Sequence, residues 1–287
     1  MKNNLNIPPS IIEPIVRLAL NEDFGNYGDI TSSLLVPKSA KNKLYLRSRS
    51  DGIISGIQPA KMTYELIDSS VKFTTILKDS YSVKKGDIIA VIEGSALSLL
   101  AGERIALNFM GRLSGIATLT AKYVAIVKGT NTRIAATRKT TPGLRALEKQ
   151  AVLAGGGFTH RGSLSSSIMI KDNHIALSGG IENALNTLNK KADHMAHINV
   201  EVDTIDQLEV VLKYSPDVIL LDNMSIEDLS HAVKIIKSYD GYSPKIEASG
   251  NINLSTVEEI SKTGVDIISI GSLTHSSQNF DLGMDTN

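Results

Sequence analysis

Polar and charged residues end six apolar stretches in the second half of the chain, and their types are those that bind anions and divalent cations. In chain order the stretches end in Arg138 and Lys139, Lys171, Glu201, Asp222, Ser249 and Gly271. Charged groups are costly inside a core. In a barrel of alternating strands and helices we therefore expect them at the carboxyl ends of the strands, where such folds carry their chemistry. The spacing predicts one site assembled from these strand ends.

The cations in this region outnumber the acids, which indicates an anionic ligand. Five cationic or hydrogen-bonding side chains come from two neighbouring strand ends and the loop between them: Arg138, Lys139, His160, Arg161 and Lys171. Only Glu201 and Asp222 oppose them. Arginine presents a planar pair of donors that suits carboxylates and phosphates, and lysine presents a point charge. We expect these anions to bind here, with the two acids on a divalent cation or on ribose hydroxyls.

The last two stretches, EASGN and IISIGS, end in small residues. Glycine and serine let backbone N–H groups approach a ligand closely, and in barrels the loops after the last strands are the usual phosphate site. This pattern predicts phosphate binding at residues 249–251 and 271–272.

Each cluster also has a structural interpretation when it is taken alone. The stretch TRKTTPGLR is compatible with a solvated basic loop, KDNH with a capped turn, and AGGGF with a helix stop. His194 and His197 have no third ligand nearby in the sequence, so we do not expect a metal site there. The functional interpretation is favoured because six separate strands end in the same way and their charges complement one another.

The elements that position these residues alternate between strand and helix from about Thr132 onward. Stretches with helical spacing separate the apolar ones: PGLRALEKQAVLAG, GIENALNTLNKKA, TIDQLEVVLKYS, SIEDLSHAVKIIKSY and NLSTVEEISKTG. This alternation predicts a parallel sheet with right-handed crossovers, and helix N-caps at Thr204, Ser225 and either Asn253 or Ser255. A complete barrel has eight strands, so either strands lie upstream or the barrel is open.

The first part of the chain reads as a small α+β unit. Helical spacing in IIEPIVRLAL and PAKMTYELID predicts two helices, and KLYLRSRSDGIISG and SVKKGDIIAVIEG predict strands, with a turn at 85–87. The next stretch, from SALSLL to IVKG, has apolar residues at helical spacing for about thirty positions. Gly111 and the pair Ser114 and Gly115 predict breaks in it, and so two or three helices.

Composition excludes several classes of protein. The 287 residues carry a formal net charge of zero, so no overall field attracts nucleic acid or a membrane surface. No apolar stretch approaches the roughly 20 residues that span a bilayer. The absence of cysteine excludes disulfides and thiolate metal sites and agrees with a reducing compartment. We expect a cytoplasmic protein that binds neither nucleic acid nor membrane.

With these residues in view, the chain resembles the quinolinate phosphoribosyltransferases (nicotinate-nucleotide pyrophosphorylases, carboxylating) over nearly its whole length. The shared motifs are LNEDFGNYGDITS, GERIALNFMGRLSGIAT, TRKTTPGLRALEKQAV, GGGFTHR, IMIKDNHI, VEVDTIDQLE, ILLDNMS, EASGNI and TGVDIISIGSLTHS. These stretches are long and occur in order, so the resemblance is specific.

The resemblance implies a fold and an assembly. It implies an N-terminal α/β sandwich at residues 1–112, joined by the C-terminal tail 275–287, and an open α/β barrel at residues 113–274. It also implies a homodimer or a higher homo-oligomer, in which Arg104 of GERIALNF enters the site of the neighbouring subunit.

The resemblance also implies an activity. The family transfers a phosphoribosyl group from phosphoribosyl pyrophosphate to quinolinate with decarboxylation, which yields nicotinate mononucleotide, pyrophosphate and CO2 for NAD biosynthesis. Carried over by position, the substrate-binding residues are Arg104, Thr137, Arg138, Lys139, His160, Arg161, Lys171, Glu201, Asp222, Ser249, Gly250, Asn251, Gly271 and Ser272. The same carry-over implies catalytic roles for Lys139, Lys171, Glu201 and Asp222, with Mg²⁺ held by the two acids together with pyrophosphate.

Three other functions compete with this one. A pyrophosphorylase-like relative linked to molybdenum transport shares the barrel and an AVLAGGG…HR stretch, but the KDNH segment at 171–174 favours the quinolinate enzymes. A Schiff-base lyase using Lys171 or Lys139 fits less well with the surplus of arginine. A ligand sensor without activity has less need of Glu201 and Asp222.

Overall fold

The computed structural model describes residues 7–286, and the chain forms two compact units. The first unit comprises the described residues of Met1–Ala121, Lys139–Gly157 and Ser272–Asn287, and the second comprises Lys122–Arg138 and Phe158–Gly271. The chain therefore passes between the units several times, whereas the expected domains divide it at a single position and add only the C-terminal tail.

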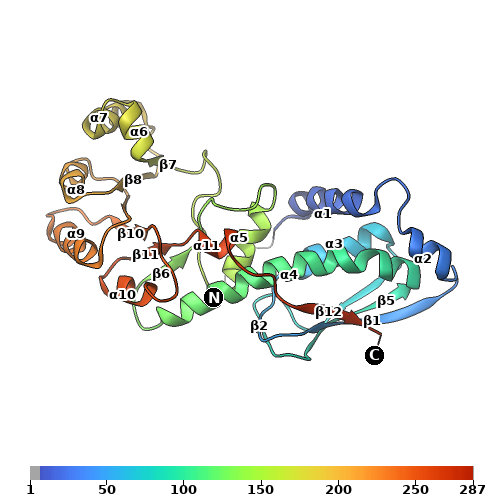
Figure 1. Cartoon of the computed structure of the whole chain (residues 1–287). Coiled ribbons are helices and arrows are strands. Elements are labelled where there is room, and N and C mark those ends of the chain that lie inside the picture. Colours follow the sequence, from blue (N-terminus) through green and yellow to red (C-terminus); the bar gives the residue numbers. More distant parts are fainter. Residues whose placement is uncertain (1–6, 287) are drawn as a thin grey trace. The chain divides into compact units, whose positions relative to one another are not determined.

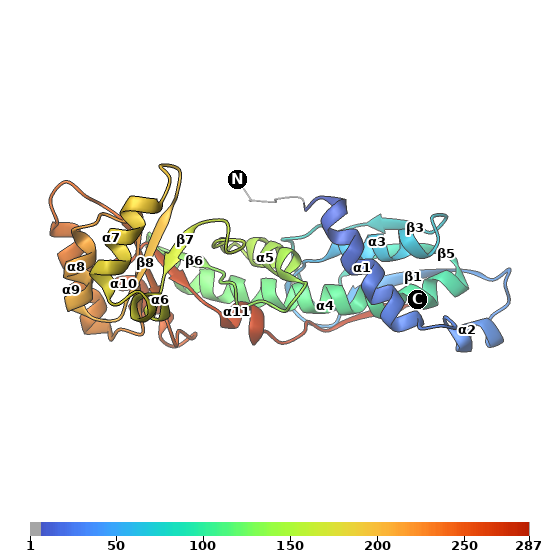
Figure 2. The same cartoon turned by 90° about the horizontal axis from the view of Figure 1, so that it is seen from above.

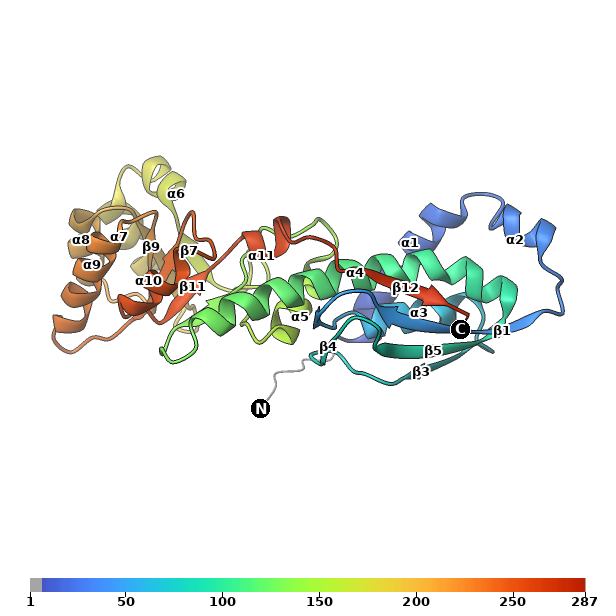
Figure 3. The same cartoon turned by 60° about the horizontal axis from the view of Figure 1, so that its bottom comes forward.

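The first unit holds an antiparallel sheet in the strand order β12-β1-β5-β3 (Figure 1). Its elements are α1 (Pro9–Phe24), α2 (Ile30–Leu35), β1 (Lys41–Ser48), β2 (Gly52–Ile53), α3 (Ile57–Ile67), β3 (Lys72–Thr75), β4 (Ser82–Val83), β5 (Ile88–Ser95), α4 (Ala96–Ile126), α5 (Arg145–Ala154), α11 (Ser272–His275) and β12 (Leu282–Asp285). Helix α4 belongs to this unit as far as Ala121. The last strand pairs with β1, with Leu46 opposite Met284, so the C-terminal tail completes the sheet of this unit (Figure 3).

The core of the first unit lies between this sheet and the helices α3 and α4. Leu46 of β1, Ile92 of β5 and Met110 of α4 are fully buried in one hydrophobic cluster, which Met284 of β12 joins. Tyr64 of α3 is fully buried in the same cluster and tilts against Phe73. Alternating apolar residues on the strands therefore place one face of the sheet in the core.

One continuous helix, α4, replaces the two or three helices expected between residues 96 and 126, so that prediction was wrong. A Cβ atom on Gly115 would lie 2.0 Å from the carbonyl oxygen of Gln278, and one on Gly111 would lie 3.2 Å from that of Phe280. The backbone N–H of Phe280 also donates to the carbonyl of Gly111 over 2.8 Å. These glycines are sites of close packing by the C-terminal segment, which is why they leave the helix unbroken.

The second unit contains a six-stranded parallel sheet in the order β6-β11-β10-β9-β8-β7. Its elements are β6 (Arg133–Ala135), β7 (Ile168–Ile170), α6 (Asp172–Leu177), α7 (Ile181–Lys191), β8 (Ile198–Val202), α8 (Ile205–Leu212), β9 (Val218–Asp222), α9 (Ile226–Ser238), β10 (Lys245–Ser249), α10 (Val257–Lys262) and β11 (Ile267–Ser269). The predicted strands and their parallel arrangement are confirmed, and β6 and β7 are edge strands, so the barrel is open. Helices α7, α8 and α9 lie together on one side of the sheet (Figure 2).

Side chains at the helix starts were mostly predicted correctly. Thr204 accepts a hydrogen bond from the N–H of Gln207, and Ser225 accepts one from that of Asp228. The expected cap of α10 at Asn253 or Ser255 was wrong, because the helix begins later and its N-cap is Thr256. The Asn253 side chain instead closes a turn by accepting from the N–H and the hydroxyl of Ser255.

Candidate active site

The parallel register places the expected acids on one face of the sheet. Glu201 of β8 lies beside Leu220 of β9, and Asp222, two residues further along β9, lies beside Ser249 of β10. Residues two apart on a strand point to the same face, and neighbours in register share it. Glu201, Asp222 and Ser249 therefore share one face near the carboxyl ends of their strands.

One of the expected cations contacts one of the expected acids in the structure. Lys171 follows β7, and its ammonium donates a hydrogen bond to the Oε2 atom of Glu201 on the neighbouring strand β8. The Glu201 side chain is 8% exposed and that of Lys171 is 42% exposed, so the ammonium reaches from the surface to a buried carboxylate. Lys171 and Glu201, both expected at the site, are therefore in direct contact.

The acids around this pair influence one another. Burial raises the pKa of Glu201, the contact with Lys171 lowers it, and the negative charges of Asp222 and Asp172 raise it further. Desolvation, followed by the charges of Asp222 and Asp172, also raises the pKa of Asp203. A divalent cation would relieve this repulsion. Within residues 7–286, no three acidic, histidine or cysteine side chains are grouped as a metal site.

Two arginines are close enough for their charges to repel each other. Arg138 follows the edge strand β6, and Arg161 lies in the loop that follows α5. Desolvation lowers the pKa of Arg161, and the positive charge of Arg138 lowers it further. Arg161 also donates to the carbonyl of Ser167 over 3.3 Å. Both side chains are half-buried. Two guanidinium groups that repel each other would gain from a bound anion, as the sequence predicted.

His160 lies next to an acid that the sequence analysis did not include. Its Nε2 atom is 3.3 Å from the Oε2 atom of Glu247 on β10. The alternation of β10 carries the signal that was missed, because Glu247 stands two residues before Ser249 and therefore shares its face. The expected surplus of cations over acids is smaller by this one carboxylate.

The loops after β9 and β10 are joined by asparagine side chains. The N–H of Asn223 donates to the carbonyl of Ser249 over 3.0 Å, and the Asn251 amide donates to Asn223 Oδ1 over 3.1 Å. Asn223 and Asn251 have positive φ angles of 53° and 50°. Gly250 has φ +95°, and a Cβ atom there would lie 2.2 Å from Asn223 Oδ1. Only glycine fits this turn, so the backbone at the expected phosphate loop is tightly specified.

Three of the expected site residues belong to the first unit and are described within it. Arg104 is exposed on α4, and Lys139 and Ser272 begin the segments Lys139–Gly157 and Ser272–Asn287. The carbonyl of Lys139 accepts a hydrogen bond from Thr274 Oγ1 over 2.7 Å, which fixes the backbone of the basic loop. Thr137 and Gly271 lie in the second unit.

The basic loop is also held by a buried ion pair. Glu148 of α5 is fully buried and accepts from Arg112 Nη2 over 2.8 Å and from Arg112 Nε over 3.0 Å. The same carboxylate accepts from the hydroxyl and the N–H of Thr141, over 2.7 and 3.1 Å. The stretch TRKTTPGLR is thus anchored at Thr141 and is no freely solvated loop.

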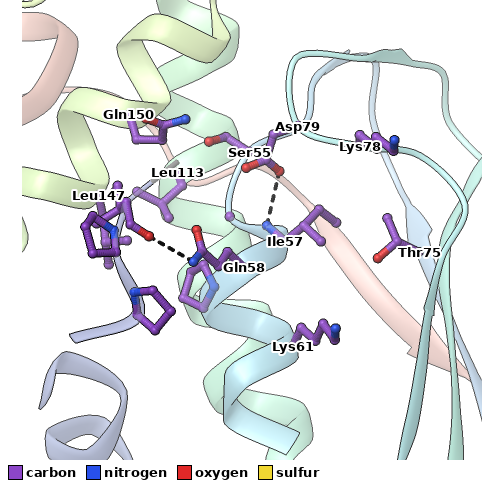
Figure 4. A pocket seen from close by; sticks show the side chains of 15 residues that line it. Ser55, Ile57, Gln58, Lys61, Thr75, Lys78, Asp79, Leu113, Leu147 and Gln150 are labelled. Carbon is purple, nitrogen blue, oxygen red and sulfur yellow. Dashed lines mark hydrogen bonds between the residues drawn. The ribbon is translucent and has the colours of Figure 1, made fainter. Parts of the chain in front are cut away.

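A separate cavity of about 550 Å³ lies in the first unit (Figure 4). Asp79 accepts there from the N–H of Ile57 over 3.1 Å, at the start of α3, and the Gln58 amide donates to the carbonyl of Ile7 over 3.0 Å. None of the expected site residues lines this cavity. Asp79 accepts from the N–H groups of Gly56 and Ile57, so a carboxylate of the chain itself lies at the start of α3.

Comparison with known proteins agrees with the geometry. The chain matches the family model "Quinolinate phosphoribosyl transferase, C-terminal domain" over residues 116–285 and the corresponding N-terminal domain over residues 29–114. The chain belongs to the quinolinate phosphoribosyltransferase family.

Relatives in this family are similar over most of their length. The probable nicotinate-nucleotide pyrophosphorylase [carboxylating] of Bacillus subtilis is 42% identical, with 92% of this chain and 89% of the relative covered. Quinolinate phosphoribosyltransferase [decarboxylating] 1b of Nicotiana tabacum is 38% identical, with 96% and 83% covered. The crystal structure of nicotinate-nucleotide pyrophosphorylase from Ehrlichia chaffeensis superposes with a TM-score of 0.91 at 39% identity, with 98% and 99% covered.

The matches to the quinolinate phosphoribosyltransferase family models begin at residue 29 and so include the described elements that follow α1. The two family models together include the antiparallel sheet, α4, the parallel sheet and the C-terminal strand. No described helix of this chain combines the length and the apolar composition needed to cross a membrane.

Proposed function

We propose that this chain transfers the phosphoribosyl group of phosphoribosyl pyrophosphate to quinolinate, with loss of CO2, and so forms nicotinate mononucleotide and pyrophosphate for NAD biosynthesis. Membership of the family supports the reaction. The observation in the structure that carries the proposal is the contact of Lys171 with Glu201 beside Asp222, which combines a cation for an anionic substrate with paired acids.

The chain's own residues would supply binding, orientation and electrostatic stabilisation. Arg138, His160 and Arg161 would hold the two carboxylates of quinolinate and so aim the ring nitrogen at the ribosyl carbon. As pyrophosphate leaves, that carbon becomes positive, and Lys171 would stabilise the negative charge that develops on the leaving group. The ribosylated ring nitrogen is positive and accepts the electrons released when the adjacent carboxylate departs, so decarboxylation needs no separate nucleophile.

Ribose and phosphate binding would fall to the remaining residues. Glu201 and Asp222 would accept hydrogen bonds from the ribose hydroxyls. The loops that end β10 and β11 would bind the 5′-phosphate through Ser249, Gly250, Asn251, Gly271 and Ser272. The tight turn at Gly250 supports this assignment, because a residue without a side chain lets a phosphate approach the backbone closely.

Glu201 and Asp222 also fit Mg²⁺. Both offer carboxylate oxygens. Burial raises the pKa of Glu201, the negative charge of Asp222 adds to this, and a divalent cation nearby would offset that charge. With only two protein acids as ligands, Mg²⁺ would retain water and phosphate oxygens, and when bound it would neutralise charge on pyrophosphate. We include Mg²⁺ in the proposal as a partner of phosphoribosyl pyrophosphate.

The proposal includes a homodimer or a higher homo-oligomer in the cytoplasm. Arg104 is exposed on α4 of the first unit, where it is available to a second copy of the chain. The absence of cysteine agrees with the reducing compartment.

The test is a product assay with quinolinate, phosphoribosyl pyrophosphate and Mg²⁺. We expect one nicotinate mononucleotide and one CO2 per quinolinate consumed. Nicotinate in place of quinolinate is the control and should give no product. Product from nicotinate at a similar rate would assign the chain to a reaction without decarboxylation, and no product from either would refute the proposed function.

A further inference from the structure

A buried acid outside the expected site lies on the site face of the parallel sheet. Glu247 of β10 is 1% exposed. In the register of the sheet it lies beside Leu220, which lies beside Glu201. Neighbours in a parallel register point to the same face, so the row consists of two carboxylates with a leucine between them.

The partner of Glu247 is His160, one of the expected substrate-binding residues. The Nε2 atom of His160 lies 3.3 Å from Glu247 Oε2, and the histidine side chain is 16% exposed. His160 follows Phe158, which forms a bridge to Ala135 of β6. The backbone that carries the ring is therefore tied to the sheet two residues before it.

The carboxylate of Glu247 is only partly satisfied. Its second oxygen, Oε1, is buried and has no hydrogen-bond partner among the residues that the structure describes. A buried carboxylate with an unsatisfied oxygen costs free energy, whereas an apolar side chain such as Leu220 would pack in this row without that cost. A contribution to packing alone therefore does not explain an acid at this position.

We propose that Glu247 is a positioning residue that holds the His160 ring in the orientation in which it contacts a substrate carboxylate. The Nε2 atom of His160 contacts Glu247 Oε2, and this contact with a buried carboxylate fixes the plane of the ring. This role rests on the proposed function, in which His160 binds quinolinate, and Glu247 itself does not touch substrate.

The first test is Glu247→Gln, which keeps the shape and an acceptor oxygen but removes the charge. We expect the KM for quinolinate to rise about tenfold or more, as for the loss of a hydrogen bond to a charged group, while the KM for phosphoribosyl pyrophosphate and kcat change much less. Glu258→Gln is the control, because Glu258 lies exposed on α10, where it pairs with Lys262, and it should leave all constants unchanged. Equal changes in both KM values, or none, would overturn the proposal.

A double substitution separates positioning from a general structural role. In a His160→Gln background the ring is absent, so adding Glu247→Gln should not raise the KM for quinolinate further. A further tenfold rise in this background would show that Glu247 acts by another route and would overturn the proposal.

A spectroscopic measurement tests the pairing without substrate turnover. We expect the ¹⁵N signals of the His160 ring, assigned by their loss in His160→Gln, to shift in Glu247→Gln, because Nε2 then faces an amide instead of a carboxylate. Unchanged signals would overturn the positioning role even if the enzyme makes nicotinate mononucleotide. The expected shift in a protein that makes no product would support the pairing and refute only the proposed function.

Discussion

The ammonium of Lys171 donates a hydrogen bond to a carboxylate oxygen of Glu201, across the ends of the neighbouring strands β7 and β8. The contact joins a half-exposed cation to a buried acid whose pKa is raised by burial. In the proposed reaction this lysine is placed to meet the leaving pyrophosphate, while the carboxylate stays available to ribose and Mg²⁺.

Lys171→Ala should lower turnover at least about a hundredfold, which corresponds to about 2.7 kcal/mol of lost transition-state stabilisation. The variant removes the cation for the leaving group and leaves Glu201 buried without its partner. Steady-state kinetics with both substrates saturating measure the effect. Lys190→Ala, at an exposed position on α7, is the matched control and should retain the full rate. A Lys171→Ala enzyme within a few-fold of that control would remove Lys171 from the mechanism.

Arg104→Ala and Arg138→Ala chains, each inactive alone, should regain activity when combined in one dimer. If Arg104 acts in the neighbouring subunit, the mixed dimer contains one site with both arginines and one with neither, so we expect about half the activity of the unaltered dimer. Two different affinity tags allow isolation of the mixed dimer for the assay. An inactive mixed dimer would show that both arginines act within one chain.

Glu148→Ala should destabilise the protein by about 3–5 kcal/mol, because it leaves Arg112 and Thr141 without the buried acceptor that they share. Urea denaturation followed by circular dichroism measures the free energy of unfolding. Glu258→Ala, which removes an exposed acid on α10, should leave that free energy unchanged. Equal stability of the two variants would mean that the Arg112–Glu148 pair does not hold the basic loop.

Asp79 predicts a pH dependence of stability. Desolvation raises its pKa in the folded protein, although the N–H groups of Ile57 and Gly56 lower it in part. The folded protein therefore binds this proton at a higher pH than the unfolded chain, whose value is about 3.9. The ionised carboxylate costs stability at neutral pH, and that cost disappears as the pH falls through the raised pKa.

Asp79→Asn keeps an acceptor for the N–H of Ile57 and has no charge to titrate. The stability of the variant minus that of the unaltered protein should therefore be largest near pH 7 and should decrease towards pH 4. Urea denaturation at several pH values gives this difference, in which titrations shared by the two proteins cancel. A difference that is constant, or that grows as the pH falls, would contradict the raised pKa.

The strands of the second unit could be predicted because each is an apolar stretch that ends in a residue unfit for the core. The six strand ends and their parallel pairing follow from that pattern. Glu247 was not predicted as a site residue, because the pattern concerns the last residue of each strand and Glu247 lies within β10.

Other features depend on partners that are distant in the sequence. Gly111 and Gly115 look like helix breakers until the carbonyl groups of Gln278 and Phe280 are seen to pack against them. The anchor of the basic loop requires Arg112, which lies 36 positions from Glu148. A local pattern does not specify such contacts, because they form only when the C-terminal segment and α5 pack on α4.

The most direct test of the account is a crystal structure of the protein with quinolinate bound. We expect its two carboxylates to contact Arg138, His160 and Arg161 at the carboxyl ends of the parallel strands. Quinolinate bound instead in the cavity beside Gln58 and Asp79, or bound without contact to any of these three residues, would contradict the account.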